Sequence, residues 1–266
     1  LCFEGPQEEL TKTEKCQPAL FVTSMAAHAA LCELAPSLTP VGVAGLSLGE
    51  LTSLAVAQAL KLGDAFYLVQ ARADAMAECT ARHKGAMLAV VGLSPEAMAP
   101  VCEESGASAA NYNAQDQIVL SGTVEAIDKA EGLAKAAGAK RAIRLEVAGA
   151  FHSSLMQSAA ARFKHAVSHV SFQAPRVPVV SNVTGRPVRE PADIQDILVK
   201  QIVSPVLWEP SMRYLIQQGA THFIEFPPAR VLTGLLRRID PSVKGIAIDA
   251  PADFDKLSDL HAVRRP

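Results

Sequence analysis

The sequence has almost no net charge and no long apolar run, and each absence excludes a class of protein. The formal net charge is −2 over 266 residues, which argues against a general nucleic-acid-binding protein. No uninterrupted apolar run reaches the roughly 18 residues that a bilayer-spanning helix needs. We therefore expect neither nucleic acid nor membrane among the partners of this chain.

The cysteines are few and follow no ligand or disulfide pattern. They are odd in number and scattered, at Cys2, Cys16, Cys32, Cys79 and Cys102, with no Cys-x-x-Cys spacing. This usage is typical of reduced thiols in a cytosol-like compartment and suggests no zinc site. No secretory n-region is present, so we expect a cytoplasmic protein. The first residue is leucine rather than methionine, as in a fragment or a processed product.

What is present is enough apolar material for a large core. Apolar residues make up 49% of the chain and charged residues 20%, which is typical of a globular protein. Helix-like and strand-like segments alternate, which predicts an α/β fold with a parallel sheet. In such a sheet reactive groups gather at the carboxyl ends of the strands.

One stretch has an order of its own. Residues 85–147 read as strand 86–91, helix 95–105, strands 109–113 and 117–121, helix 124–137 and strand 141–147. This β-α-β-β-α-β order is that of a ferredoxin-like unit. We therefore predict a ferredoxin-like subdomain over 85–147, inserted into an α/β catalytic core formed by 1–84 and 148–266.

The core is predicted from the remaining segments. We expect strands at 41–44, 177–181, 221–226 and near 246–248, and helices at 150–170, 194–202, 210–218 and 231–239.

The most informative motif is a serine between two glycines at a strand-to-helix junction. It reads Gly45-Leu46-Ser47-Leu48-Gly49-Glu50, after a short apolar run and before a helical pattern. A Gly-x-Ser-x-Gly turn of this kind raises the hydroxyl above the sheet edge and points the next N–H at an oxyanion. The alternative is a Ser-x-x-Glu capping box, which starts ordinary helices. A capping box does not need Gly45 and Gly49, whereas a turn packed against its own strand does.

Two other residues are candidates for chemistry. His152 follows a predicted strand and begins a helix, where a parallel sheet presents its site, whereas the other six histidines have no special context. Arg72 lies in a mostly apolar helical run, so its side chain either reaches the surface or turns inward to meet a carboxylate. Local context alone favours the surface for Arg72.

Taken together, the motifs resemble one family. The serine motif, Arg72, the Asn111-Tyr112-Asn113 segment with Gln117, and Gly149-Ala150-Phe151-His152 occur in the order seen in malonyl-CoA:acyl carrier protein transacylases. The resemblance covers about residues 5–250. It implies an enzyme that transfers a malonyl group from malonyl-CoA to acyl carrier protein in fatty-acid or polyketide synthesis. It implies no cofactor and no metal, and we expect a monomer.

The resemblance also implies a role for individual residues. Ser47 would be the nucleophile and His152 its base, held by a backbone carbonyl rather than by an aspartate. Arg72 would clamp the malonyl carboxylate, and the N–H of Leu48 would donate to the oxyanion. The expected supporting residues are Gln17 behind the arginine, Asn111, Asn113 and Gln117 along the pantetheine channel, and Phe151 as the group that excludes an α-methyl substituent.

A basic cluster lies beside the last strand of the predicted subdomain. It consists of Lys140, Arg141 and Arg144, and the first two match the family's carrier-docking position. On charge alone the cluster could equally be a solvated strand edge.

The chain departs from the family pattern in three places. The family's opening strand, which carries Gly-Gln-Gly and an oxyanion donor, is absent, and losing one such donor typically costs about 100- to 1,000-fold in turnover. Leu46 replaces a histidine, and Pro227-Pro228-Ala229 replaces a Gly-Pro-Gly turn expected near the carbonyl partner of His152. A catalytically weakened carrier-binding module is therefore one alternative.

The other alternative is a serine esterase or thioesterase of the α/β-hydrolase type. Asp249 and His261 could complete a Ser-Asp-His triad. However, only 46 residues precede Ser47, which is too few for the strands that come before the elbow in that fold. Such a hydrolase would also leave Arg72 without a role.

Overall fold

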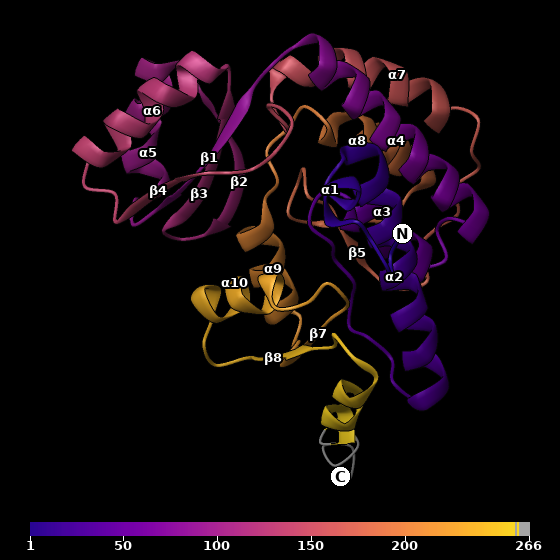
Figure 1. The fold of residues 1–266 in the computed structure, drawn as a ribbon. Coiled ribbons are helices and arrows are strands. Elements are labelled where there is room, and N and C mark those ends of the chain that lie inside the picture. The colour runs from indigo at the N-terminus through magenta and orange to yellow at the C-terminus, as the bar shows by residue number, and fades with distance from the viewer. Residues whose placement is uncertain (259, 261–266) are drawn as a thin grey trace.

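A computed structural model of the chain describes residues 1–258 and 260 (Figure 1). The helices are α1 (Gln7–Leu10), α2 (Thr13–Leu34), α3 (Gly49–Val56), α4 (Leu62–Arg82), α5 (Pro95–Ser105), α6 (Val124–Ala136), α7 (Gln157–Val167), α8 (Pro191–Gln201), α9 (Trp208–Gln217) and α10 (Val231–Ile239), with 3₁₀ turns η1 (Ser154–Met156) and η2 (Pro251–Leu257). The strands are β1 (Ala86–Val91), β2 (Ser108–Ala114), β3 (Gln117–Gly122), β4 (Arg141–Arg144), β5 (Val179–Val180), β6 (Pro187–Val188), β7 (His222–Glu225) and β8 (Lys244–Ala247). Helices and strands alternate, so the fold is of the α/β class, as the sequence predicts.

Residues 86–144 form a lobe with a sheet of its own. Its strands lie in the order β2-β3-β1-β4, and every neighbouring pair is antiparallel. Figure 1 shows α5 and α6 together at the outer side of this sheet. Both helices start at a side-chain cap, because Ser94 accepts from Ala97 N at 3.3 Å and Thr123 from Ala126 N at 3.1 Å. The element order β-α-β-β-α-β is the one that the local patterns predict.

The largest core lies outside this lobe, among the helices around α3. Buried side chains of α2, α3, α4, α7 and α8 form one apolar cluster, which includes Phe21, Leu51, Leu68, Phe163 and Ile194. This packing fixes α3 against α4. Because Ser47 precedes α3 and Arg72 lies on α4, the same packing determines how the two residues meet.

The continuous parallel sheet that we predicted is present only in pieces within the described residues. β7 pairs with β8 in parallel, and a single parallel bridge joins Val43 to Val179. β5 pairs with β6 antiparallel, which the sequence did not predict. A cavity of about 670 Å³ lies between residues 41–46 and β7. These two segments do not pair with each other within the described residues.

One predicted helix begins later than the sequence indicates. We expected a helix over 150–170, but His152 has a backbone φ of 58°, a left-handed value that no helix residue adopts. A 3₁₀ turn follows, and α7 spans only Gln157–Val167. His152 therefore lies in a sharp turn ahead of the helix rather than in its first turn.

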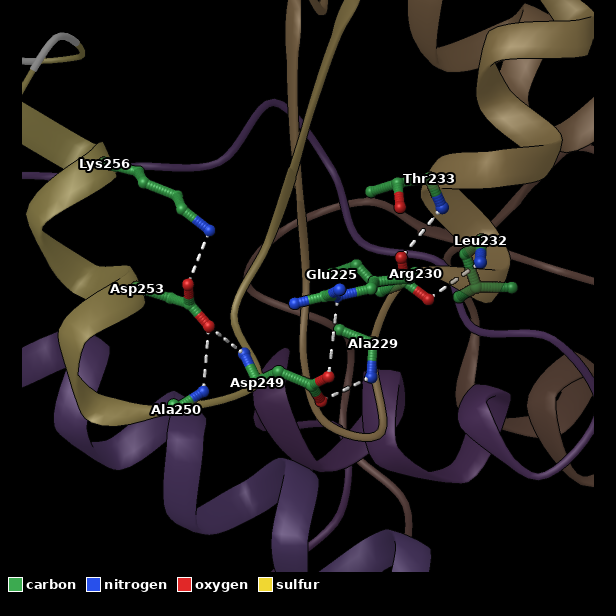
Figure 2. Close-up of polar contacts among 9 residues, drawn as sticks. All are labelled: Glu225, Ala229, Arg230, Leu232, Thr233, Asp249, Ala250, Asp253 and Lys256. Carbon is green, nitrogen blue, oxygen red and sulfur yellow. Dashed lines mark hydrogen bonds and ion pairs between the residues drawn. The ribbon is translucent and has the colours of Figure 1, made fainter.

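The C-terminal part is held together by carboxylates bound to backbone amides (Figure 2). Glu225, at the end of β7, accepts from Leu232 N at 2.7 Å and from Thr233 N at 2.8 Å, so its carboxylate caps α10. Asp249 accepts from Ala229 N at 2.9 Å. Among the helices that the structure describes, none has the length and hydropathy needed to cross a bilayer.

Candidate active site

Ser47 lies at a tight elbow between residues 43–46 and α3. Its φ is 53°, a strained value for a residue other than glycine. A Cβ on Gly45 would lie 2.1 Å from the backbone of Gly49, so this turn can close only with glycine at 45. A Cβ on Gly49 would meet nothing within 4 Å. The expectation that the elbow needs both glycines is therefore right for Gly45 and wrong for Gly49.

The capping-box alternative for this motif is wrong. The residue that caps α3 is Leu48, and no side chain makes a cap hydrogen bond there. The carboxylate of Glu50 instead accepts from Asn182 N at 3.3 Å and from Gln201 Nε2 at 2.5 Å. The N–H of Leu48 makes no hydrogen bond to any residue that the structure describes.

Ser47 and His152 are brought into direct contact. Ser47 Oγ lies 2.7 Å from His152 Nε2, and His152 Nδ1 lies 2.8 Å from the backbone oxygen of Gln201. A carbonyl oxygen can only accept, so Nδ1 carries the hydrogen and Nε2 is left to accept from the serine hydroxyl. The structure therefore shows a dyad whose histidine is oriented by a backbone carbonyl.

The imidazole of His152 is enclosed and stays neutral. Its residue is 4% exposed. Burial, and after it the positive charge of Arg72, lowers the pKa of His152 to about 4. At neutral pH the ring can therefore accept a proton from Ser47.

Arg72 points inward, so the surface placement favoured by its local context is wrong. It is 2% exposed, and its guanidinium donates from Nη1 to Gln17 Oε1 at 2.6 Å. From Nη2 it donates to Ser47 Oγ and to Gln201 Oε1, both at 2.9 Å. Burial lowers the pKa of Arg72 to about 10, and Glu50 partly offsets this, so the group stays charged at neutral pH.

No acidic side chain in the described residues pairs directly with Arg72. The hydrogen-bond partners of its guanidinium are amide and hydroxyl oxygens, and none of the ion pairs of the described chain includes it. A buried cation without a contacting anion is costly unless a ligand supplies one. The site is therefore suited to bind an anionic group beside the serine hydroxyl.

Two residues that hold the site were not singled out in the sequence. Asn182 Oδ1 accepts from Ser47 N at 2.6 Å, and its Nδ2 donates to Gly45 O at 2.8 Å, so one side chain bridges the elbow. Gln201 uses both its backbone and its side chain on the site. Neither residue lies in a motif. The only sequence signals were that Asn182 follows a predicted strand and that Gln201 lies at the end of a predicted helix.

The predicted channel residues lie on the small sheet. Asn111 lies opposite Val119 on the neighbouring strand, so the two side chains share one face of the sheet. Phe151, the residue before His152, packs against the cluster that contains Val119, so this face is turned toward the dyad. Gln117 is two residues before Val119 on β3 and shares that face. Asn113 is buried, and its Oδ1 has no hydrogen-bond partner among the described residues.

The three basic residues at β4 differ in their contacts. Lys140, Arg141 and Arg144 are all exposed. Arg144 pairs with Asp128 and Glu131 of α6, so its charge is already compensated within the lobe. Lys140 and Arg141 are the more suitable members for an external partner.

The residues needed for a hydrolase-type triad do not gather here. Asp249 accepts from Ala229 N and lies 3.8 Å from Arg230 (Figure 2). The imidazole that contacts Ser47 Oγ is that of His152. His261 lies outside the described residues. The loop at Pro227 does not hold His152, because the partner of His152 Nδ1 is Gln201 O. The Pro227 carbonyl instead accepts from Ser24 Oγ at 3.0 Å.

The cavity next to β7 is separate from the dyad. Its lining is mainly apolar and includes Leu46, Leu48 and Gly49, but none of Ser47, Arg72 or His152. The cavity is therefore lined by the chain neighbours of Ser47 but not by Ser47 itself.

Comparisons with known proteins agree with this geometry. Residues 2–247 match the family model of the acyl transferase domain. A relative named malonyl CoA-acyl carrier protein transacylase, from Bacillus subtilis, is 43% identical over 96% of this chain and 81% of its own length. The protein of that name from Escherichia coli K12 is 38% identical over 95% of this chain and 82% of its own length.

Solved structures are similar over the same range. An acyl carrier protein S-malonyltransferase from Vibrio cholerae superimposes with a TM-score of 0.92 at 35% identity, covering 96% of this chain and 84% of its own. A malonyl-transacylase solved in complex with a type II polyketide acyl-carrier protein has a TM-score of 0.92 at 34% identity, over 96% of this chain and 84% of its own. The chain belongs to the acyl transferase family, among relatives named malonyl CoA-acyl carrier protein transacylases.

Proposed function

We propose that this chain transfers a malonyl group from malonyl-CoA to the phosphopantetheine thiol of an acyl carrier protein, through a malonyl-serine intermediate. The observation that carries this proposal is the contact between Arg72 and Ser47 Oγ at 2.9 Å. A buried guanidinium with no contacting carboxylate, beside a serine hydroxyl, suits an acyl group that has its own negative charge. The names of the curated relatives support the same substrate and acceptor.

The first half-reaction follows from the dyad. Ser47 Oγ attacks the thioester carbonyl while its proton passes to His152 Nε2, and the N–H of Leu48 donates to the oxyanion. The C–S bond then breaks, and the departing CoA thiolate takes the proton from the imidazolium. The malonyl ester on Ser47 remains, with its free carboxylate on Arg72.

The second half-reaction is the reverse with a different thiol. The pantetheine thiol gives its proton to His152 and attacks the ester, and Ser47 Oγ recovers a proton as it leaves. These steps use a hydroxyl, an imidazole, a guanidinium and a backbone N–H, so the proposal includes no cofactor. Malonyl-CoA is a substrate.

The remaining candidate residues take supporting roles in this proposal. Gln17 holds the far side of the guanidinium through the 2.6 Å contact. Phe151 precedes the base and packs between two core clusters, where its ring would restrict space for an α-methyl group. Asn111, Asn113 and Gln117 would line the path of the pantetheine arm, and Lys140 and Arg141 would meet the acidic carrier.

The strand order supports the proposed domain division. We infer that 85–147 is a ferredoxin-like subdomain inserted into a hydrolase-like core of 1–84 and 148–266. The order β2-β3-β1-β4 with both helices at one side is the arrangement expected of a split β-α-β unit. Pantetheine and its carrier would then reach Ser47 along the boundary between subdomain and core.

Intact-mass spectrometry tests the function. Incubation with malonyl-CoA should add a malonyl group to the wild type and none to Ser47→Ala, because Ser47 is the serine that contacts both the buried imidazole of His152 and the guanidinium of Arg72. Release of CoA without an adduct would indicate a hydrolase, and no reaction would indicate a binding module. An adduct on the Ser47→Ala variant at another serine would show that a different nucleophile acts.

A further inference from the structure

Glu50 is a buried acid that the proposed reaction does not use. The residue is 2% exposed, and its carboxylate contacts Asn182 N and Gln201 Nε2. No basic side chain of the described chain forms an ion pair with it. Burying a carboxylate that is compensated only by hydrogen bonds, with no ion pair, costs free energy. The contacts of Glu50 should therefore indicate what role this residue has.

The amide of Gln201 lies between this carboxylate and Arg72. Its Nε2 donates to Glu50 Oε2 at 2.5 Å and to Ser47 O at 2.9 Å, while its Oε1 accepts from Arg72 Nη2 at 2.9 Å. A carboxylate only accepts and a guanidinium only donates. The Gln201 amide therefore satisfies both Glu50 and Arg72 in the observed orientation. If the amide were flipped, its NH₂ group would face the guanidinium of Arg72, which is also a donor.

A second neighbour of Glu50 holds the nucleophile. Asn182 gives its backbone N–H to Glu50, and with its side chain it bonds Ser47 N and Gly45 O. Gln201 in turn holds His152 through its backbone carbonyl. Two of the three residues that contact Glu50, Asn182 and Gln201, are thus the ones that hold the reacting groups, and the third is Ser181.

We propose that Glu50 is a positioning residue, whose carboxylate fixes the Gln201 amide so that Oε1 faces Arg72 and holds the guanidinium ready for an acidic acyl group. This rests on the proposed function, since it assigns Arg72 to the malonyl carboxylate. The acetyl group has no such carboxylate. Glu50 should therefore affect malonyl transfer more than acetyl transfer.

Glu50→Gln is the direct test, because it keeps the size of the side chain. Glutamine has one acceptor oxygen and one donor nitrogen, whereas Asn182 N and Gln201 Nε2 both need an acceptor. One of them then faces a donor, and the Gln201 amide loses its fixed orientation. We expect acylation by malonyl-CoA to fall about 10-fold and acylation by acetyl-CoA about 3-fold or less, as for the loss of one hydrogen bond to a charged group.

The wild type offers a second test through its pH profile. Burial raises the pKa of Glu50 to about 7, although hydrogen bonds from Gln201, Asn182 and Ser181 and the charge of Arg72 act against the shift. The titratable group that acts on Glu50 is Arg72 on α4, with a pKa of about 10, and His152, which contacts Gln201, has a pKa of about 4. Neither changes charge between about pH 6 and 8. The malonyl-to-acetyl ratio should therefore rise over this range in the wild type and stay flat in Glu50→Gln.

Glu225→Gln is the matched control. Glu225 is 6% exposed and also gives its carboxylate to two N–H groups, those of Leu232 and Thr233, but it caps α10 and contacts no residue of the dyad (Figure 2). This variant should lower the melting temperature and leave the substrate ratio and its pH dependence as in the wild type.

The measurement is single-turnover acyl-enzyme formation, followed by intact mass, with malonyl-CoA and with acetyl-CoA for each protein. A ratio of the two rates on the same sample does not depend on the folded fraction, so a destabilised variant still gives an answer. The role of Glu50 alone would be overturned if the wild type takes a malonyl group on Ser47 and Glu50→Gln has the same malonyl-to-acetyl ratio and the same pH profile as the wild type. A wild type that takes no malonyl group would overturn the proposed function itself.

Discussion

Arg72 donates from Nη2 to the Oγ of Ser47 at 2.9 Å, the same oxygen that lies 2.7 Å from His152 Nε2. The hydroxyl oxygen of Ser47 is therefore placed between a neutral imidazole and a buried cation. A positive charge so close disfavours a protonated imidazole. The same guanidinium offers a site for an anionic acyl group beside this oxygen.

Removing the guanidinium should separate the two substrates. Arg72→Ala leaves malonate's carboxylate unpaired, and losing a charge-assisted bidentate contact is worth roughly 2–4 kcal/mol, or about 30- to 1,000-fold in malonyl transfer. Acetyl transfer should stay the same or rise. The rate of malonyl transfer by Arg72→Lys should lie between those of the wild type and Arg72→Ala. Acyl-enzyme formation with both CoA esters measures this. A parallel fall for the two substrates would show that Arg72 has only a structural role.

Acylation should persist to a lower pH than it would if the pKa of His152 were that of an ordinary histidine. The pKa of His152 is lowered to about 4, so the folded state keeps the ring neutral where a free histidine is protonated. Acetyl-CoA acylation should be nearly constant from pH 8 to about 5 and fall through about pH 4. Quenched single-turnover rates over this range give the midpoint. A midpoint near 6.5 would mean that the ring is open to solvent.

The same shift predicts acid sensitivity of the fold. Because the folded pKa lies below the unfolded value of 6.5, the unfolded state binds more protons between these values. The free energy of unfolding should fall as pH drops from about 6.5 to 4, and His152→Gln should show a smaller fall. Urea titrations at several pH values compare the two proteins, and identical slopes would contradict the assignment.

The two glycines of the elbow should differ in their tolerance of alanine. At Gly45 a Cβ would overlap the backbone of Gly49, so Gly45→Ala should open the elbow and remove acylation. At Gly49, on the first turn of α3, the Cβ has open space, so Gly49→Ala should retain the wild-type melting temperature within a few degrees. Equal damage from both substitutions would contradict the geometry of this turn.

Asn182 should contribute to stability as well as to the elbow. Asn182→Ala leaves Ser47 N–H and Gly45 O buried without their partner, and each such group costs about 1–3 kcal/mol. Chemical denaturation measures the loss. Asn113→Ala is the control, since Asn113 is also buried but its Oδ1 has no partner within the described residues. A similar loss in both variants would show that Asn182 only fills space.

Charge reversal tests the docking surface. Lys140→Glu with Arg141→Glu should raise the KM for an acidic carrier protein and leave acylation by malonyl-CoA unchanged, because both residues are exposed on the small lobe. Arg144→Ala should mainly remove the ion pairs to Asp128 and Glu131, and so affect stability more than docking. Equal losses in both half-reactions would point to general damage.

Local sequence determined the elements whose signals lie within a few residues. Ser94 and Pro95 start α5, Thr123 starts α6, and the apolar period of Val231–Ile239 gives α10, because caps and periodicity act over one or two turns. The serine elbow was likewise readable from Gly45 and Ser47. The extent of the parallel sheet could not be read from the sequence, because strand pairing depends on residues that are far apart in the chain. The segment 41–46 has a bridge to Val179 on one side and lines a cavity on the other.

Only the tertiary structure decided how the site is held. Arg72 could be assigned inward only through the family resemblance, since its local context alone favours the surface. Gln201 and Asn182 lie 154 and 135 residues from Ser47 along the chain, and no motif links them to it. Their roles come from the packing of α3, α4 and α8 around one apolar core, which brings an amide, a guanidinium and a carboxylate within hydrogen-bond distance in a buried site. In that setting each polar group must find a protein partner, so the burial of the site rather than its sequence context determines which atoms meet.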